Sequence, residues 1–395
     1  MPRVEMSVAG FRRTAFSLVE MLLVIAVIGV LVALLLPALS GARDTGLKVS
    51  SQSLMADLAT AAQRFGNDNA GRNPGFFSEA EMGHSDNQDI GMSAAENVML
   101  ELGGSAAILG LESDPAVASL IDEDAGIIAI GPKNDTMETP RVVVNVNLIG
   151  SDGGYFTPEQ KFFQVQPHGA DGDGQAGSAA GEGQELMPDI VDAWGNPLLI
   201  WAQDESARGS ILATSDGDEV YTQFVRVSSD GNGELGDTEG PAWFYLASNH
   251  AFLNASEFGS QGINMGGDPT TGRASVLGDS VDDMDRIYTL AAMLASPGSY
   301  QLDPAETDLS GTTFDRVFPT RPRGRFIVHS AGIDNVYMSG TDTGWLSNAD
   351  IQSDYRLEFG TNYISRGGAR LTDDAGAFTN EDMMDDFDDL IVGSK

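Results

Sequence analysis

The residue whose surroundings most clearly call for a binding partner is Glu20, a carboxylate near the start of an apolar run that extends from Phe16 to Leu39. A charged side chain costs roughly 2.5 to 3.5 kcal/mol at the centre of a bilayer and less near its surface, so it normally has a partner there. The chemistry expected of Glu20 is therefore ion pairing with a cation in a layer of low dielectric constant.

The apolar run has the length of one membrane-spanning helix, because no residue from Met21 to Ala42 is charged and about 20 helical residues cross a bilayer. Arg12 and Arg13, just upstream, favour a cytoplasmic N-terminus with everything after residue 42 across the membrane. A secretory signal is the alternative, since Ala38-Leu39-Ser40 offers a cleavage site and the arginine pair suggests a twin-arginine motif. The length of the run and the acid at its start favour an anchor.

The residues around Glu20 resemble the N-terminal signal of type IV pilins and type II secretion pseudopilins. They combine a basic pair, a small residue, the segment Phe16 to Glu20 and an apolar stretch that contains Pro37. The resemblance implies that a prepilin peptidase cuts between Ala15 and Phe16 and methylates the new N-terminus. It also implies that Glu20 pairs with the terminal amine of a neighbouring subunit during assembly. Ala15 departs from the glycine usual before the cut, and the alternative is a plain signal anchor whose Glu20 reaches the membrane surface.

Two later segments resemble parts of the major type II secretion pseudopilins. Residues 192–198 read Asp-Ala-Trp-Gly-Asn-Pro-Leu, similar to the D-x-W-G-x-P segment of that family. Residues 326–335 contain a predicted strand and an S-x-G-x-D turn, and an Asp-rich segment follows at residues 385–392. In those pseudopilins the strand, the turn and the Asp-rich segment together hold one calcium ion.

By this resemblance, the candidate calcium ligands are Asp334, Asp388 and Asp389. Loop carbonyls near Ser330 would complete the coordination. Calcium takes six to eight oxygen ligands, and gathered carboxylates would repel one another without it. Here about 50 residues, an insertion relative to the family, separate the turn from the Asp-rich segment. The alternative is a solvated acidic tail in which residues 390–392 pair as a final strand.

Catalytic chemistry finds little support in the sequence. The four histidines are isolated, no cysteine is present, and neither a G-x-S-x-G elbow nor a G-K-[ST] phosphate loop occurs. Acids are abundant enough to hide a carboxylate pair of the glycosidase type, but no spacing singles one out. We therefore expect no enzymatic activity.

The elements that position these residues follow from hydrophobic spacing. One helix is expected from Phe16 to about Phe65, with residues 16–39 in the membrane and residues 40–66 amphipathic, because apolar residues recur on one face at intervals of three, four and seven. Shorter helices are expected at 93–102, 115–121 and 284–294. Strands are expected at 126–130, 141–149, 198–202, 220–228, 242–247, 325–330 and 355–359.

This pattern predicts an α+β fold in which the long N-terminal helix packs on an antiparallel sheet, as in pilins but with large insertions. The expected organisation is a leader at residues 1–15, the helix at 16–66 and a globular domain at 67–395. Within that domain, residues 169–184 are rich in glycine and are expected to form a flexible segment.

Composition limits the partners of the globular domain. The whole chain, most of which is this domain, carries 58 acidic residues against 22 basic ones, a formal charge of -36. Such a surface repels phosphate backbones and attracts divalent cations, so we expect no nucleic-acid partner. Without cysteine the fold has no disulfide, although it would lie in an oxidising compartment.

Two classes of function fit these observations. The first is structural: a pseudopilin or pilin-like subunit, anchored by a single pass in the inner membrane with its domain in the periplasm, then packed by its helix into a filament with other pilins. The second is a periplasmic or cell-surface binding protein that uses a pilin-like anchor. With 395 residues, the chain is far longer than compact major pseudopilins and resembles a minor, tip or expanded subunit.

Overall fold

The computed structural model describes residues 18–82, 92–132, 141–151, 153–164, 187–202, 322–339 and 387–394, with shorter pieces between 212 and 319 and at 382 and 384. The expected leader, the glycine-rich segment at 169–184 and the strands expected at 242–247 and 355–359 lie outside the described residues. So do nearly all of the strand expected at 220–228 and the helix expected at 284–294. The chain divides into two compact units, Met1–Leu47 and Lys48–Lys395.

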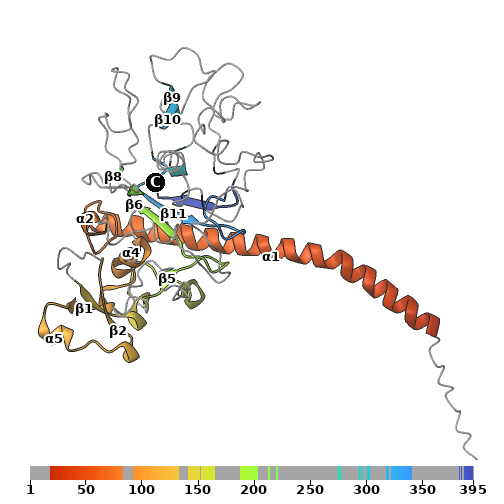
Figure 1. Ribbon diagram of the computed structural model, residues 1–395, viewed down its shortest axis with the longest axis horizontal. Helices are drawn as coiled ribbons and strands as arrows, with labels where there is room; N and C mark the ends of the chain where they lie inside the picture. Colours follow the sequence, from red (N-terminus) through yellow and green to blue (C-terminus); the bar gives the residue numbers. More distant parts are fainter. Residues whose placement is uncertain are drawn as a thin grey trace, which may run out of the picture. The chain divides into compact units, whose positions relative to one another are not determined.

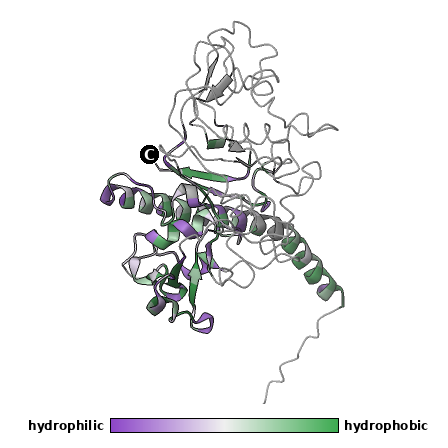
Figure 2. Cartoon of the chain, turned by 60° about the vertical axis from the view of Figure 1, so that its left-hand side comes forward, coloured by the Kyte–Doolittle hydropathy of each residue, from purple (hydrophilic) through white to green (hydrophobic). Residues whose placement is uncertain are grey.

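The longest element is helix α1 (Leu18–Asp68), which has 51 residues (Figure 1). In its first turns the large apolar side chains from Leu18 to Val32 are 46% to 80% exposed. Figure 2 shows this end of the helix in the colour of hydrophobic residues. Within the part of the chain that the structure describes, no helix combines the length and the apolar character that crossing a membrane requires.

The second part of α1 buries one face in the core of the larger unit, as the spacing of its apolar residues predicts. Leu54, Leu58 and Phe65 are each at most 6% exposed. The helix ends in a turn in which Ala70 and Gly71 have φ values of 58° and 86°. The N–H of Gly71 donates to the carbonyl of Gly66 at 2.7 Å, which satisfies one of the last carbonyls of the helix.

Helix α4 (Ala94–Leu102) starts with a capping box at the boundary expected from the sequence. Ser93 Oγ accepts the N–H of Glu96 at 3.0 Å, and Glu96 Oε2 accepts the N–H of Ser93 at 2.7 Å. All of its residues except Glu101 are buried. A helix buried on all sides belongs to the interior of the domain, so α4 is a core element.

Two three-stranded antiparallel sheets cover this core. The first has the order β1-β3-β2 and consists of β1 (Ile108–Leu111), β2 (Ile127–Ile130) and β3 (Val142–Asn145). The second has the order β12-β11-β6 and consists of β6 (Leu199–Ala202), β11 (Phe326–Ser330) and β12 (Leu390–Gly393). Helices and antiparallel sheets together make the fold α+β, as predicted.

The second sheet is buried on both faces. Phe326 and Val328 of β11 face the core that contains α1 and α4. The alternate residues Ile327 and His329 are 0% exposed on the other face, where the rings of His329 and Trp201 stack at 6.4 Å. The strand at 390–392 in the sequence alternative is confirmed, since β12 pairs with β11 from Ser330↔Leu390 onward. The solvated tail of that alternative is wrong at Asp389, which is 5% exposed and bonded to His329.

The strand expected at 141–149 is wrong beyond Asn145. The Asn145 side chain accepts the N–H of Asn147 at 3.1 Å, and this local bond starts a 3-10 turn, η3 (Val146–Leu148), in place of further strand pairing. The helix expected at 115–121 is likewise shorter, because α5 spans Pro115–Ala118.

Smaller elements complete the described chain. β4 (Phe163–Gln164) pairs with β5 (Asp189–Ile190), β7 (Leu212–Ala213) with β8 (Glu219–Val220), and β9 (Tyr300–Leu302) with β10 (Val317–Pro319). Helical turns occur in α2 (Glu79–Met82), η1 (Ser105–Ala107), η2 (Glu123–Ala125) and η4 (Gln160–Phe162).

Candidate functional site

The segment Asp192 to Pro197 folds around the carboxylate of its first residue. Three successive backbone N–H groups, from Trp194 to Asn196, donate to Asp192 Oδ1 at 2.9 to 3.0 Å. Gly195 has a φ of 97°, a conformation that glycine adopts without strain. Asp192 therefore shapes the D-x-W-G-x-P segment into a turn that leads into β6.

This turn is bonded to the S-x-G-x-D turn that follows β11. Ser330 Oγ donates to Asp192 Oδ2 at 2.7 Å, and Asn196 Nδ2 donates to Asn335 Oδ1 at 2.7 Å. β6 and β11 are neighbours in the sheet, with His329 opposite Leu199, so the two turns meet at the same sheet end. The two segments singled out in the sequence, more than 130 residues apart, thus form one site.

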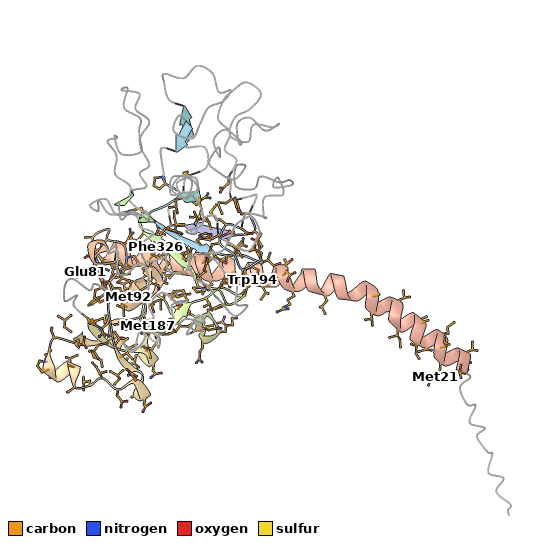
Figure 3. All side chains as sticks on the ribbon, in the orientation of Figure 1. Met21, Glu81, Met92, Met187, Trp194 and Phe326 are labelled. Carbon is orange, nitrogen blue, oxygen red and sulfur yellow. The ribbon has the colours of Figure 1, made fainter. Side chains whose placement is uncertain are left out.

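The site also contacts α1 directly. The N–H of Ala193 donates to Ser51 Oγ at 3.0 Å, and Ser51 is 0% exposed. Trp194, labelled in Figure 3, is partly buried and packs against the core. The second part of α1 therefore fixes the turn to the body of the domain.

The Asp-rich segment lies against the S-x-G-x-D turn, despite the insertion between them. Asp388 Oδ2 accepts the N–H groups of Ile333 and Asp334 at 2.7 and 2.9 Å. Gly332 has a φ of 71°, and a Cβ atom there would overlap the carbonyl oxygen of Asp388. Only glycine permits this approach of the two backbones.

Two of the three predicted calcium ligands, Asp334 and Asp388, lie next to each other. Burial and the charge of Asp388 raise the pKa of Asp334 to about 7, and the charge of Asp389 adds to this shift. The N–H of Val336, which donates to Asp334 Oδ1 at 2.8 Å, acts in the opposite direction. The turn therefore holds acids that repel one another in a partly dry site.

The third predicted ligand, Asp389, is engaged elsewhere. Its carboxylate accepts the N–H of Met338 at 3.0 Å and meets His329 Nε2 at 2.5 Å. Burial lowers the pKa of His329 to about 3. Burial and then the charge of Asp388 raise the pKa of Asp389 well above its usual range. The imidazole is therefore neutral, and this pair is a buried hydrogen bond of the core rather than an exposed ligand set.

A calcium ion fits part of this arrangement. Asp388 Oδ1 is buried and has no hydrogen-bond partner among the described residues. A bound cation would satisfy such an oxygen. Asp334 lies next to it, and backbone carbonyls of the turn are oxygen donors of the kind that calcium prefers. No group of three or more His, Cys, Asp or Glu side chains suited to a metal occurs in the described part of the chain. Asp334 and Asp388 therefore fit the ion better than Asp389.

The predicted processing and assembly residues belong to the other unit. Ala15 and Phe16 lie outside the described residues. Glu20 lies in the first turn of α1, where the positive end of the helix dipole favours a carboxylate.

No family model, no curated protein and no solved structure matches this chain. The functional conclusions therefore depend on the residues and contacts described above. Among these, sequence reasoning missed the central role of Asp192, whose carboxylate makes four hydrogen bonds. An Asp that precedes a Gly-Asn-Pro turn is a recognisable signal for side chain to backbone bonding, and it could have identified this residue.

Proposed function

We propose that this chain is a structural subunit of a filament of the type II secretion or type IV pilus kind. The N-terminal signal from Arg12 to Glu20 supports this class of protein, and the contrast between the two ends of α1 supports assembly through the helix. Large apolar side chains from Leu18 to Val32 are exposed, whereas Leu54, Leu58 and Phe65 are buried in the chain's own core. A helix with one part packed and the other uncovered is suited to packing against partner helices.

The observation that carries the proposal is the joint between α1 and the two pseudopilin-like turns. Ser51 of α1 bonds to Ala193, and Asp192 bonds to Ser330 of the following turn. The resemblance noted in the sequence thus concerns residues that contact one another and α1. If the two sequence segments resembled pseudopilins by chance alone, contacts between them and with α1 would not be expected.

In this proposal residues 16–39 lie in the inner membrane as a single pass before assembly, and the domain lies in the periplasm. The uncharged sequence from Met21 to Ala42 and the basic pair before it support that orientation. Prepilin peptidase frees the amine of Phe16, and this amine pairs with Glu20 of a neighbouring subunit. The chain acts as a building block and performs no catalysis.

Calcium belongs to the same proposal. Asp388 Oδ1 and the carboxylate of Asp334 would hold the ion, together with carbonyls of the turn near Ser330. When bound, the ion neutralises the mutual repulsion of these acids and fixes the C-terminal segment to the turn.

Mass spectrometry of the mature N-terminus tests the assignment. We expect a protein that begins with N-methylated Phe16. A chain that begins at Gly41 would indicate a cleaved secretory signal, and an uncut Met1 would indicate a plain anchor. Either result would overturn the proposal.

A further inference from the structure

Two acidic side chains lie buried where α4 meets β5. Glu96 and Asp189 are 2% and 1% exposed. Met92 and Met187, labelled in Figure 3, precede them in the chain and are each 1% exposed in the same core. The pair is therefore enclosed by apolar side chains and closed to bulk water.

Ser93 contacts both acidic residues, the side chain of Asp189 and the backbone of Glu96 through its hydroxyl, and the carboxylate of Glu96 through its N–H. Ser93 Oγ donates to Asp189 Oδ1 at 3.1 Å and also accepts the N–H of Glu96 at 3.0 Å. Asp189 Oδ2 is buried and has no hydrogen-bond partner among the described residues. The N-terminal cap of α4 is thus tied to β5 through a single serine.

The surroundings offer little to neutralise two negative charges. The described elements β4, β6 and η1, which pack on α4 or β5, carry no titratable side chain. Among the described residues, Tyr337, which follows β11, also senses the charge of Asp189. Two carboxylates cannot both stay ionised in such an interior, so at least one holds a proton near neutral pH.

We propose that Glu96, Ser93 and Asp189 form a proton-dependent latch that holds α4 on β5 and releases it as the pH rises. This inference is independent of the proposed filament function. Burial raises the pKa of Asp189 to about 8. Burial and then the charge of Asp189 raise the pKa of Glu96 well above its usual range.

The direction of the effect follows from these shifts. Both acids have a higher pKa in the folded chain than in the unfolded one, so the folded chain binds more protons between the two values. For Asp189 that window extends from about pH 4 to about pH 8. The stability that the latch supplies is complete below this window and falls as the pH rises through it.

Hydrogen exchange of the full chain in detergent solution tests the latch. Exchange of residues 94–102 is measured at pH 5.5, 7.0 and 8.5 and corrected for the intrinsic pH dependence of amide exchange. We expect the protection of α4 to fall about tenfold or more across this range, since one proton changes an equilibrium up to tenfold per pH unit. In Asp189→Asn, which cannot ionise at this position, we expect a much flatter profile.

Asp114→Asn is the matched control, because Asp114 caps the exposed helix α5 and should leave the pH dependence of α4 unchanged. Glu96→Gln is the second variant if Asp189→Asn fails to fold. Protection of α4 that does not change with pH in the unmodified chain would overturn the proposal, as would an unaltered profile in Asp189→Asn. Protection restored at pH 8.5 by added calcium would assign the pair to a cation and would also overturn it.

Discussion

The bond between Asp192 and Ser330 joins the two turns of the candidate site, and its removal should destabilise the domain measurably. Ser330→Ala deletes the donor to Asp192 Oδ2 at 2.7 Å and leaves a buried carboxylate oxygen without that partner. A hydrogen bond to a charged group contributes roughly 1.5 to 3 kcal/mol, so we expect a loss of about 2 kcal/mol. Asp192→Ala also leaves three backbone N–H groups without their acceptor, so we expect the free energy of unfolding to fall by about 4 kcal/mol.

Urea unfolding of the full chain in detergent solution, followed by tryptophan fluorescence, measures these losses. The double variant should be only slightly less stable than Asp192→Ala alone, with a coupling energy of about 2 kcal/mol between the two positions. Ser119→Ala is the control, because its hydroxyl makes one exposed bond, and its effect should stay within about 0.5 kcal/mol.

The coupling should also depend on pH. Burial raises the pKa of Asp192 to about 6, so the carboxyl is ionised at pH 8 and protonated in the folded chain at pH 5. At pH 5 the bond to Ser330 becomes a neutral one, and the coupling should fall to about 1 kcal/mol. A coupling below about 0.5 kcal/mol at pH 8 would refute the idea that this bond holds the turns together.

The remaining predictions concern assembly, the close backbone approach and the ion. Glu20→Val should insert into the membrane normally but fail to enter filaments, as judged by crosslinking of sibling subunits in cells; normal filaments would remove the pairing role. Gly332→Ala should lower the free energy of unfolding by more than about 2 kcal/mol for two reasons: a Cβ there would overlap the carbonyl oxygen of Asp388, and the backbone of residue 332 is left-handed. Gly153→Ala separates the two causes, since Gly153 has a φ of 102° with open space around it and should lose only the strain, about 1 kcal/mol. A calcium chelator should lower the melting temperature of the unmodified chain but not of Asp388→Ala, and no shift in either would remove the calcium site.

Local chemistry explains which elements were predictable. The buried stripe of α1, helix α4 and strand β11 each depend on residues close together in sequence, and all three occur where expected. β1 was missed because Gly110 interrupts its four residues and none of them is fully buried. Glycine weakens a strand pattern, and a half-exposed strand gives no strong alternation.

The candidate site shows the limit of local reasoning more sharply. The family resemblance singled out both segments, but the bond between Asp192 and Ser330 spans 138 residues and has no sequence signature. The same holds for Asp389, which the family resemblance assigns to calcium and which contacts His329, 60 residues away. Which carboxylates stay available to a cation depends on such tertiary contacts, so spacing alone could not rank the three acids.

The contacts of Asp388 and Asp389 bring together the two borders of a long stretch of chain. The N–H groups of Asp334 and Met338, before this stretch, donate to the two carboxylates that follow it. β11 and β12 pair beside these bonds, from Ser330↔Leu390 to Ile327↔Gly393, so the two borders of the stretch are held side by side in one sheet. The entropy of closing a loop grows only with the logarithm of its length, so material can be added or removed here at little expense to the fold. The domain thus has an insertion point, at which the chain could acquire a new surface while α1 and the sheet stay the same.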